Sequence, residues 1–169
     1  MDSQSGRQKQ DFGPRANFKR RKVKLGQFAG MPRELEPILA RFHDIGTLRD
    51  FATVEALFLN YDPARGAHIE PHFDDSWLWG ERLISLSLLS SSTMTMTSLD
   101  RKVEIDVPMP PRSLLVMSGA ARHEWKHSIR RDQIRHRRLC VTIRELSTSF
   151  IANNETTAAE LFKLASIFI

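Results

Sequence analysis

The sequence is poor in cysteine and has no long apolar run. Cys140 is its one cysteine, which excludes an intramolecular disulfide and any zinc site built from several cysteines, and which fits a reducing compartment. No segment approaches the roughly 20 apolar residues that a membrane-spanning helix needs. The first residues, MDSQSGRQKQDFGP, lack the apolar core of a secretory signal. The remaining composition, 41% hydrophobic and 27% charged, is that of an ordinary globular domain.

Basic residues outnumber acidic ones, which gives a net charge of +5 and a pI near 9.8. They concentrate in two clusters, at residues 15–24 and from Arg122 to Arg144. A basic surface attracts nucleic acid, acidic proteins or small anions, and it selects poorly among them. For the first cluster, a solvated surface explains the charge equally well.

The hydrophobic pattern predicts a mainly β protein with one or two flanking helices. Residues 31–43 have apolar side chains at helical spacing and predict one amphipathic helix. Alternating or fully apolar runs predict strands at 54–61, 82–90, 103–107, 113–119 and 138–146. The run PMPPR is expected to end the strand at 103–107, because proline cannot donate a hydrogen bond to a neighbouring strand. Residues 91–102 are expected to form a compact loop, and the tail after Asn154 is expected to form a short helix. Short strands separated by turns favour a barrel or a jelly roll.

The stretch PHFDD contains a candidate half of a metal site. If these residues are extended, His72 and Asp74 project from the same face, as in a two-histidine, one-carboxylate facial triad for Fe(II). A second histidine must then come from elsewhere, and His123 and His127 both qualify. On a helix, both would lie on one face, as in a zinc pair; in a loop that runs into a strand, only one would face the metal. The spacing leaves this choice open.

The strand expected at 138–146 places Arg138, Cys140, Thr142 and Arg144 on one face. A guanidinium group holds a carboxylate with two parallel hydrogen bonds, so an arginine pair on a cavity wall suits a small dicarboxylate. Two exposed arginines are the plainer interpretation of the same pattern.

The order of these motifs resembles that of the AlkB family of Fe(II)- and 2-oxoglutarate-dependent dioxygenases. The resemblance covers about residues 3–148 and is nearest to the homologue 4 branch. The stretches that carry it are SGRQKQDFGP, PHFDDSWLWGERLISLSLLS, RSLLVMSGAARHEWKH and RRLCVTIRELS. It implies a double-stranded β-helix, or jelly roll, at residues 25–148, preceded by a basic arm at 1–24 and followed by a tail or helix at 149–169. Members of the branch usually have a further N-terminal segment, so an N-terminally truncated chain is one expectation.

The resemblance also implies the roles of individual residues. By position, the Fe(II) ligands are His72, Asp74 and His127, and His123 becomes a residue of the surrounding loop. Arg138 is expected to pair with the distal carboxylate of 2-oxoglutarate, Arg144 to lie near its iron-chelating end, and Tyr61 to donate a hydrogen bond to it. Leu59 stands where the family has an asparagine, and the neighbouring Asn60 lies on the opposite strand face.

The implied activity is oxidative N-demethylation with Fe(II) as cofactor and 2-oxoglutarate as cosubstrate. The homologue 4 branch is associated with monomethyl-lysine in actin, which makes a methylated protein, actin or an actomyosin component the first expectation for a partner. A nucleic acid with N6-methyladenine or alkylated bases is the alternative, and a truncated, non-catalytic binding module is a third. Trp77 and Trp79 could line a methyl-ammonium pocket, although packing is the simpler role for them. The expected location is cytoplasmic and nuclear.

Overall fold

The protein is described from a computed structural model that covers residues 5–100 and 102–169. Its strands are β1 Gln8–Phe12, β2 Arg15–Asn17, β3 Lys22–Lys24, β4 Thr53–Tyr61, β5 Ile69–His72, β6 Trp79–Ser87, β7 Ser92–Ser98, β8 Glu104–Met109, β9 Leu114–Met117, β10 Trp125–Ile129 and β11 Arg138–Leu146. Its α-helices are α1 Glu36–Ala40, α2 Gly119–His123, α3 Thr148–Asn153 and α4 Glu155–Ala165. Single turns of 3-10 helix are η1 Phe18–Arg20, η2 Arg33–Leu35, η3 Arg41–Asp44, η4 Gly46–Leu48, η5 Pro63–Arg65 and η6 Arg131–Gln133.

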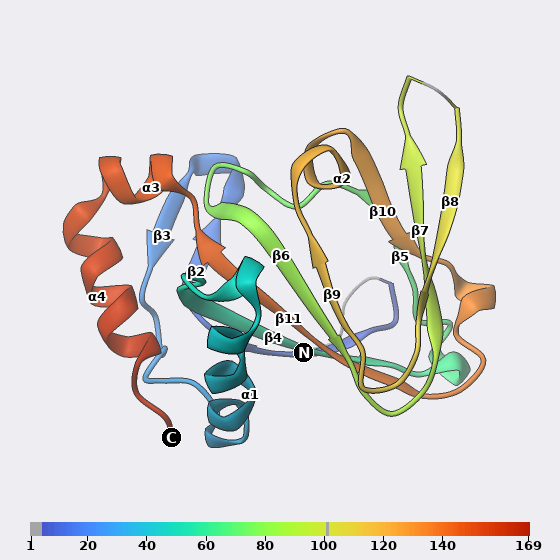
Figure 1. Ribbon diagram of the computed structural model, residues 1–169, viewed down its shortest axis with the longest axis horizontal. Coiled ribbons are helices and arrows are strands. Elements are labelled where there is room, and N and C mark those ends of the chain that lie inside the picture. Colours follow the sequence, from blue (N-terminus) through green and yellow to red (C-terminus); the bar gives the residue numbers. More distant parts are fainter. Residues whose placement is uncertain (1–4, 101) are drawn as a thin grey trace. The chain divides into compact units, whose positions relative to one another are not determined.

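Two sheets carry most of the strands (Figure 1). The larger has five strands in the order β1-β4-β11-β6-β9, and the smaller has four in the order β5-β10-β7-β8. A separate pair is formed by β2 and β3. The prediction of a mainly β protein with few helices is therefore confirmed, and no helix of the described residues is long and apolar enough to cross a membrane.

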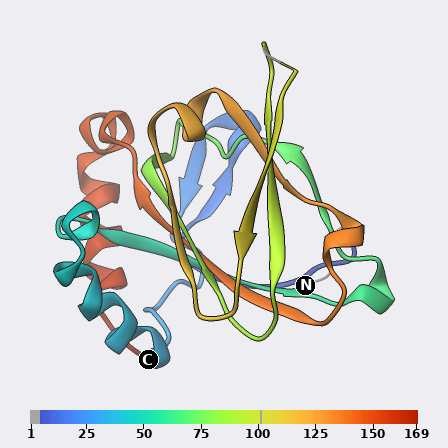
Figure 2. The ribbon, with the colours of Figure 1, turned by 45° about the vertical axis from the view of Figure 1, so that its right-hand side comes forward.

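The chain divides into two compact units, which are described separately. The first consists of Met1–Gln10, Leu57–Asp74 and Glu81–Ile143, and the second of Asp11–Ala56, Asp75–Gly80 and Arg144–Ile169. The four-stranded sheet lies wholly within the first unit, where Figure 2 shows β7 and β8 as a long hairpin. The second unit contains α1, α3 and α4 and the β2–β3 pair. The three consecutive segments expected from the sequence stay a prediction.

Strand β7 replaces the loop that was expected at 91–102, so this prediction is wrong. The stretch TMTMT alternates apolar and polar side chains with the period of two of a strand. Met94 and Met96 are buried and Thr93 and Thr97 are partly exposed, while Thr95 between the methionines is buried as well. Its position between β10 and β8 gives it a partner on each side. Methionine and threonine form a weaker apolar alternation than the aliphatic residues of β6, so the sequence pattern alone does not predict this strand.

The run PMPPR ends β8, as expected, although the strand reaches two residues into it. The strand continues to Met109, and Pro108 lies opposite Thr93 of β7. Because β8 is the last strand of its sheet, one of its edges has no partner strand there, and a proline with its nitrogen on that edge costs no ladder hydrogen bond.

The helix expected at 31–43 is divided into η2, α1 and η3. Pro37 stands in the first turn of α1, where its missing N–H costs nothing, and the regular helix ends four residues after it begins. Leu35 and Phe42 are buried, so the apolar face was identified correctly although the helix type changes along it. The terminal helix is confirmed as α4, which buries Leu161 and Ala165.

Part of the segment 1–24, for which the sequence predicts a basic arm, is built into a sheet. Residues 8–12 form β1 at one end of the five-stranded sheet, and residues 15–24 contain the β2–β3 pair and η1. Four of the five residues of β1 are exposed. Pairing here depends on the backbone, so the side chains give no hydrophobic signal. Residues 1–4 of this segment lie outside the described residues.

Candidate active site

Two adjacent strands of the first unit hold the two predicted histidine ligands side by side, and Asp74 follows just after one of them. Strands β5 and β10 are antiparallel, and His72 lies directly opposite His127 in their register. Their ring centroids are 4.3 Å apart, and His72 Nε2 lies 3.8 Å from Oδ1 of Asp74. One ligand atom from each of His72, Asp74 and His127 lies within 4.8 Å of the others. Two imidazoles and one carboxylate at this spacing fit a single ion of the kind that a facial triad holds.

The structure separates the two candidate histidines of residues 119–131. His123 is the last residue of α2, and His127 lies in β10. His123 Nε2 forms a 2.8 Å contact with the Glu81 carboxylate instead. A zinc pair on one helix is therefore wrong, because the helix ends before His127.

Backbone hydrogen bonding orients His72 for ligation. Its Nδ1 lies 2.8 Å from the carbonyl oxygen of Glu70. A carbonyl only accepts, so this contact places the ring proton on Nδ1 and leaves the Nε2 lone pair directed at the cluster. His127 is buried to 9% exposure, so its ring is shielded from water.

Arg138 at the start of β11 is a buried cation. Its side chain is 1% exposed, and Nη2 donates to Ser87 Oγ at 3.1 Å. Its Nε has no hydrogen-bond partner, and no carboxylate among the described residues pairs with its guanidinium. A buried charge is costly without a counter-charge, so this group fits a carboxylate ligand such as the distal end of 2-oxoglutarate.

Tyr61 lies beside this guanidinium at the end of β4. It is 2% exposed, and its ring centroid lies 5.2 Å from Arg138 Cζ. Burial raises the pKa of Tyr61 to about 12, and the nearby Cys140 thiol acts in the same direction. The hydroxyl therefore keeps its proton at neutral pH and can donate a hydrogen bond to an anion.

Arg144 has a different environment, in the second unit. Its Nη1 pairs with the Glu55 carboxylate, and its Cζ lies 5.4 Å from the Trp79 ring centroid. Its expected role near the iron-chelating end of the cosubstrate stays a prediction. Trp79 is buried, with 3% of its surface exposed, and the Trp77 ring packs edge-on against Phe150 with ring centroids 5.6 Å apart. Both tryptophans therefore have the packing role that was the simpler expectation.

The structure also shows the surroundings of Leu59 and Asn60, the residues near Tyr61 where the sequence departs from the family pattern. Leu59 is 7% exposed, so an apolar side chain occupies the buried position where the family has an asparagine. Asn60 donates to Gln8 Oε1 and accepts from Arg137 Nε, at 2.9 and 3.0 Å. Both contacts are exposed, and Asn60 therefore does not replace the missing amide.

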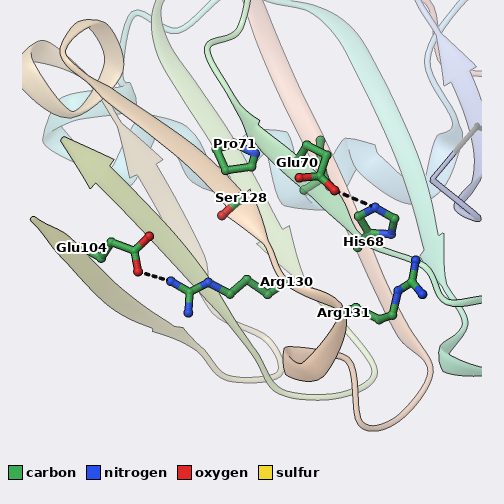
Figure 3. A pocket seen from close by; sticks show the side chains of 8 residues that line it. His68, Glu70, Pro71, Glu104, Ser128, Arg130 and Arg131 are labelled. Carbon is green, nitrogen blue, oxygen red and sulfur yellow. Dashed lines mark hydrogen bonds and ion pairs between the residues drawn. The ribbon is translucent and has the colours of Figure 1, made fainter. Parts of the chain in front are cut away.

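A pocket of about 420 Å³ borders the strands that carry the histidines (Figure 3). Its walls hold the His68–Glu70 pair, at 3.0 Å, and the Arg130–Glu104 pair. None of the three triad side chains lines it. The pocket is thus separate from the metal cluster, although residues 70–71 and Ser128 adjoin the ligands in sequence.

Sequence reasoning missed the groups that support the site through the backbone. Arg122 donates to the Asp74 carbonyl oxygen, and Ser87 accepts from Arg138. Such contacts depend on which strands are neighbours and not on residue spacing. No sequence pattern could have identified them.

The comparison with known proteins agrees with this geometry. The family model described as "2OG-Fe(II) oxygenase superfamily" matches residues 4–144. The chain belongs to this superfamily. By its name the superfamily uses Fe(II) and 2-oxoglutarate, for which His72, Asp74, His127 and Arg138 are suitable side chains.

Several curated relatives carry AlkB names. The chain is 40% identical to the human "Alpha-ketoglutarate-dependent dioxygenase alkB homolog 4", an alignment that covers 98% of the chain and 66% of that protein. It is also 40% identical to a Caenorhabditis elegans "DNA N6-methyl adenine demethylase", covering 98% of the chain and 58% of the relative. The chain therefore spans less than two thirds of these relatives. The resemblance to the AlkB family and its homologue 4 branch is confirmed.

Solved structures support the fold. A Pseudomonas putida prolyl-4-hydroxylase superposes with a TM-score of 0.54 at 19% identity, covering 85% of this chain and 75% of that one. "The structure of OsALKBH1" superposes with a TM-score of 0.58 at 14% identity, covering 83% and 78%. The jelly-roll prediction is confirmed.

Proposed function

We propose that the protein is an Fe(II)- and 2-oxoglutarate-dependent dioxygenase that performs oxidative N-demethylation. The observation that carries the proposal is the convergence of His72, Asp74 and His127 in the same unit as the buried Arg138. Two neutral imidazoles and a carboxylate hold a metal and leave positions open for a cosubstrate. The unpaired guanidinium supplies the charge that a dicarboxylate needs.

Each side chain has a defined part in this function. His72, Asp74 and His127 would hold the iron, Arg138 would pair with the distal carboxylate of 2-oxoglutarate, and Tyr61 would donate its hydroxyl proton to the same anion. With Fe(II) and O₂, 2-oxoglutarate is decarboxylated to succinate and CO₂ while the N-methyl carbon of the substrate is oxidised and leaves as formaldehyde. The protein's own contribution is to fix these positions.

For the substrate we propose monomethyl-lysine in a protein such as actin. Its support is the 40% identity to the homolog 4 proteins of human and mouse, together with the association of that branch with methylated lysine. A cytoplasmic and nuclear location accompanies this proposal. The specific observation that favours a second candidate, a nucleic-acid N-demethylase, is the name of the nematode relative.

The test measures succinate and formaldehyde from the purified chain with Fe(II), 2-oxoglutarate and O₂. A monomethyl-lysine peptide and an N6-methyladenine oligonucleotide are compared at equal concentration. His72→Ala and Asp74→Ala serve as inactive controls, and Arg130→Met, at an exposed ion pair, as the active one. Wild-type turnover no higher than that of His72→Ala refutes the activity, and faster release of formaldehyde from the oligonucleotide refutes the lysine substrate.

A further inference from the structure

Helix α2 contributes no ligand to the metal cluster, yet it contains one of the largest fully buried side chains of the described protein. Arg122 is 2% exposed. Arginine is almost never fully buried unless its charge is satisfied by well-placed partners. Its burial therefore calls for a specific contact inside the first unit.

That contact is made to a metal-ligand residue. Arg122 Nη1 donates to the carbonyl oxygen of Asp74 at 2.7 Å. A hydrogen bond from an ionised donor at this length is among the stronger ones in proteins. It fixes the peptide plane from which the Asp74 carboxylate projects toward His72 and His127.

Asp74 needs such support because no strand holds it. Strand β5 ends at His72, and residues 73–75 have no regular secondary structure. The two histidines are positioned by the β5–β10 ladder, whereas Asp74 lies beyond its end. One carboxylate of the cluster thus depends on contacts from outside the sheet.

A single carboxylate on β6 ties down α2 at both ends. Glu81 accepts from the backbone N–H of Gly119, the first residue of α2, and from Nε2 of His123, its last, at 2.8 Å. The hydrogen bond from His123, followed by that from Gly119, lowers the pKa of Glu81. With both ends held, the helix presents Arg122 inward at a fixed depth.

We propose that Arg122 is a positioning residue, which α2 and Glu81 hold against the Asp74 carbonyl so that the Asp74 carboxylate is preorganised for the metal. The inference rests on the proposed metal site and deepens it. Groups that orient metal ligands typically change metal affinity by about 10- to 100-fold when they are removed.

The experiment titrates Co(II) into the metal-free full-length chain and follows the d–d absorption bands, with no turnover involved. Arg122→Met keeps the apolar stem and removes the donors, and we expect its Kd for Co(II) to rise about 10- to 100-fold. Arg122→Lys keeps a charged donor and should recover part of the loss. Glu81→Gln weakens the anchor of α2 and should raise the Kd by a smaller factor. Arg130→Met is the matched control, expected at the wild-type Kd.

The outcomes separate the two proposals. Wild-type protein that takes up no Co(II) contradicts the proposed metal site itself. Wild-type protein that binds Co(II) with the same Kd as Arg122→Met overturns the role of Arg122 alone. If Arg122→Met does not fold by circular dichroism, Arg122→Lys and Glu81→Gln decide: a raised Kd in folded protein supports the positioning role, and unchanged values in both overturn it.

Discussion

Replacing Arg138 by methionine should stabilise the ligand-free protein while abolishing its response to 2-oxoglutarate. The guanidinium is 1% exposed and pairs with no carboxylate among the described residues. An unpaired buried charge costs several kcal/mol. The hydrogen bond to Ser87 returns about 1.5–3 kcal/mol, and the Tyr61 ring at 5.2 Å about 0.5–2 kcal/mol. These contacts offset part of the cost of burying the charge, and methionine removes the rest without a large change of volume.

The assay is urea unfolding at pH 7 followed by tryptophan fluorescence, with and without 2-oxoglutarate and Mn(II). A ligand at 100 times its Kd raises the free energy of unfolding of the wild type by about 2.7 kcal/mol, and we expect no rise for Arg138→Met. Arg130→Met, which removes an exposed ion pair, should change the free energy of unfolding by less than about 1 kcal/mol. If ligand-free Arg138→Met is less stable than the wild type, the guanidinium is already compensated and the reasoning fails. A full ligand response in the variant would equally refute its role.

Two further predictions concern stability. The folded protein holds the Tyr61 proton up to about pH 12, whereas the unfolded chain releases it near the usual pKa of 10.0, so the free energy of unfolding of the wild type should fall by on the order of 2–3 kcal/mol between these pH values. In urea titrations at pH 9 and 11.5, the free energy of unfolding of Tyr61→Phe should fall by less than that of the wild type. Equal losses would contradict the raised pKa. Leu161→Ala, at a fully buried position of α4 in the second unit, should lower the free energy of unfolding by about 2–5 kcal/mol. The Kd of this variant for Co(II) should equal that of the wild type, because the metal cluster belongs to the first unit. A weakened metal affinity would contradict that assignment.

Strands with aliphatic alternation or a largely apolar run were predictable, and strands with neither were not. The expected bounds of β11 agree with the structure, because Leu139, Val141 and Ile143 alternate with polar residues throughout. Strand β5, IEPH, is four residues long and partly exposed, so neither its existence nor its partner could be inferred from its pattern. Yet its register with β10 is what places His72 opposite His127. The sequence could supply the types of ligand, whereas their convergence depends on a pairing that only the fold shows.

The basic cluster from Arg122 to Arg144 shows most clearly what residue types alone leave open. Four of its arginines look alike in sequence, but the structure gives them different counterparts: a backbone carbonyl for Arg122, the exposed Glu104 for Arg130, the Glu55 carboxylate for Arg144, and no carboxylate of the described residues for Arg138. A guanidinium in a surface ion pair contributes little to stability. A buried guanidinium that donates to a backbone carbonyl holds that part of the backbone in place. A buried guanidinium that pairs with no carboxylate is suited to bind an anionic ligand. Burial and the partner of each guanidinium, which are properties of the fold, therefore separate the arginine that we expect to bind the cosubstrate from those that support the structure.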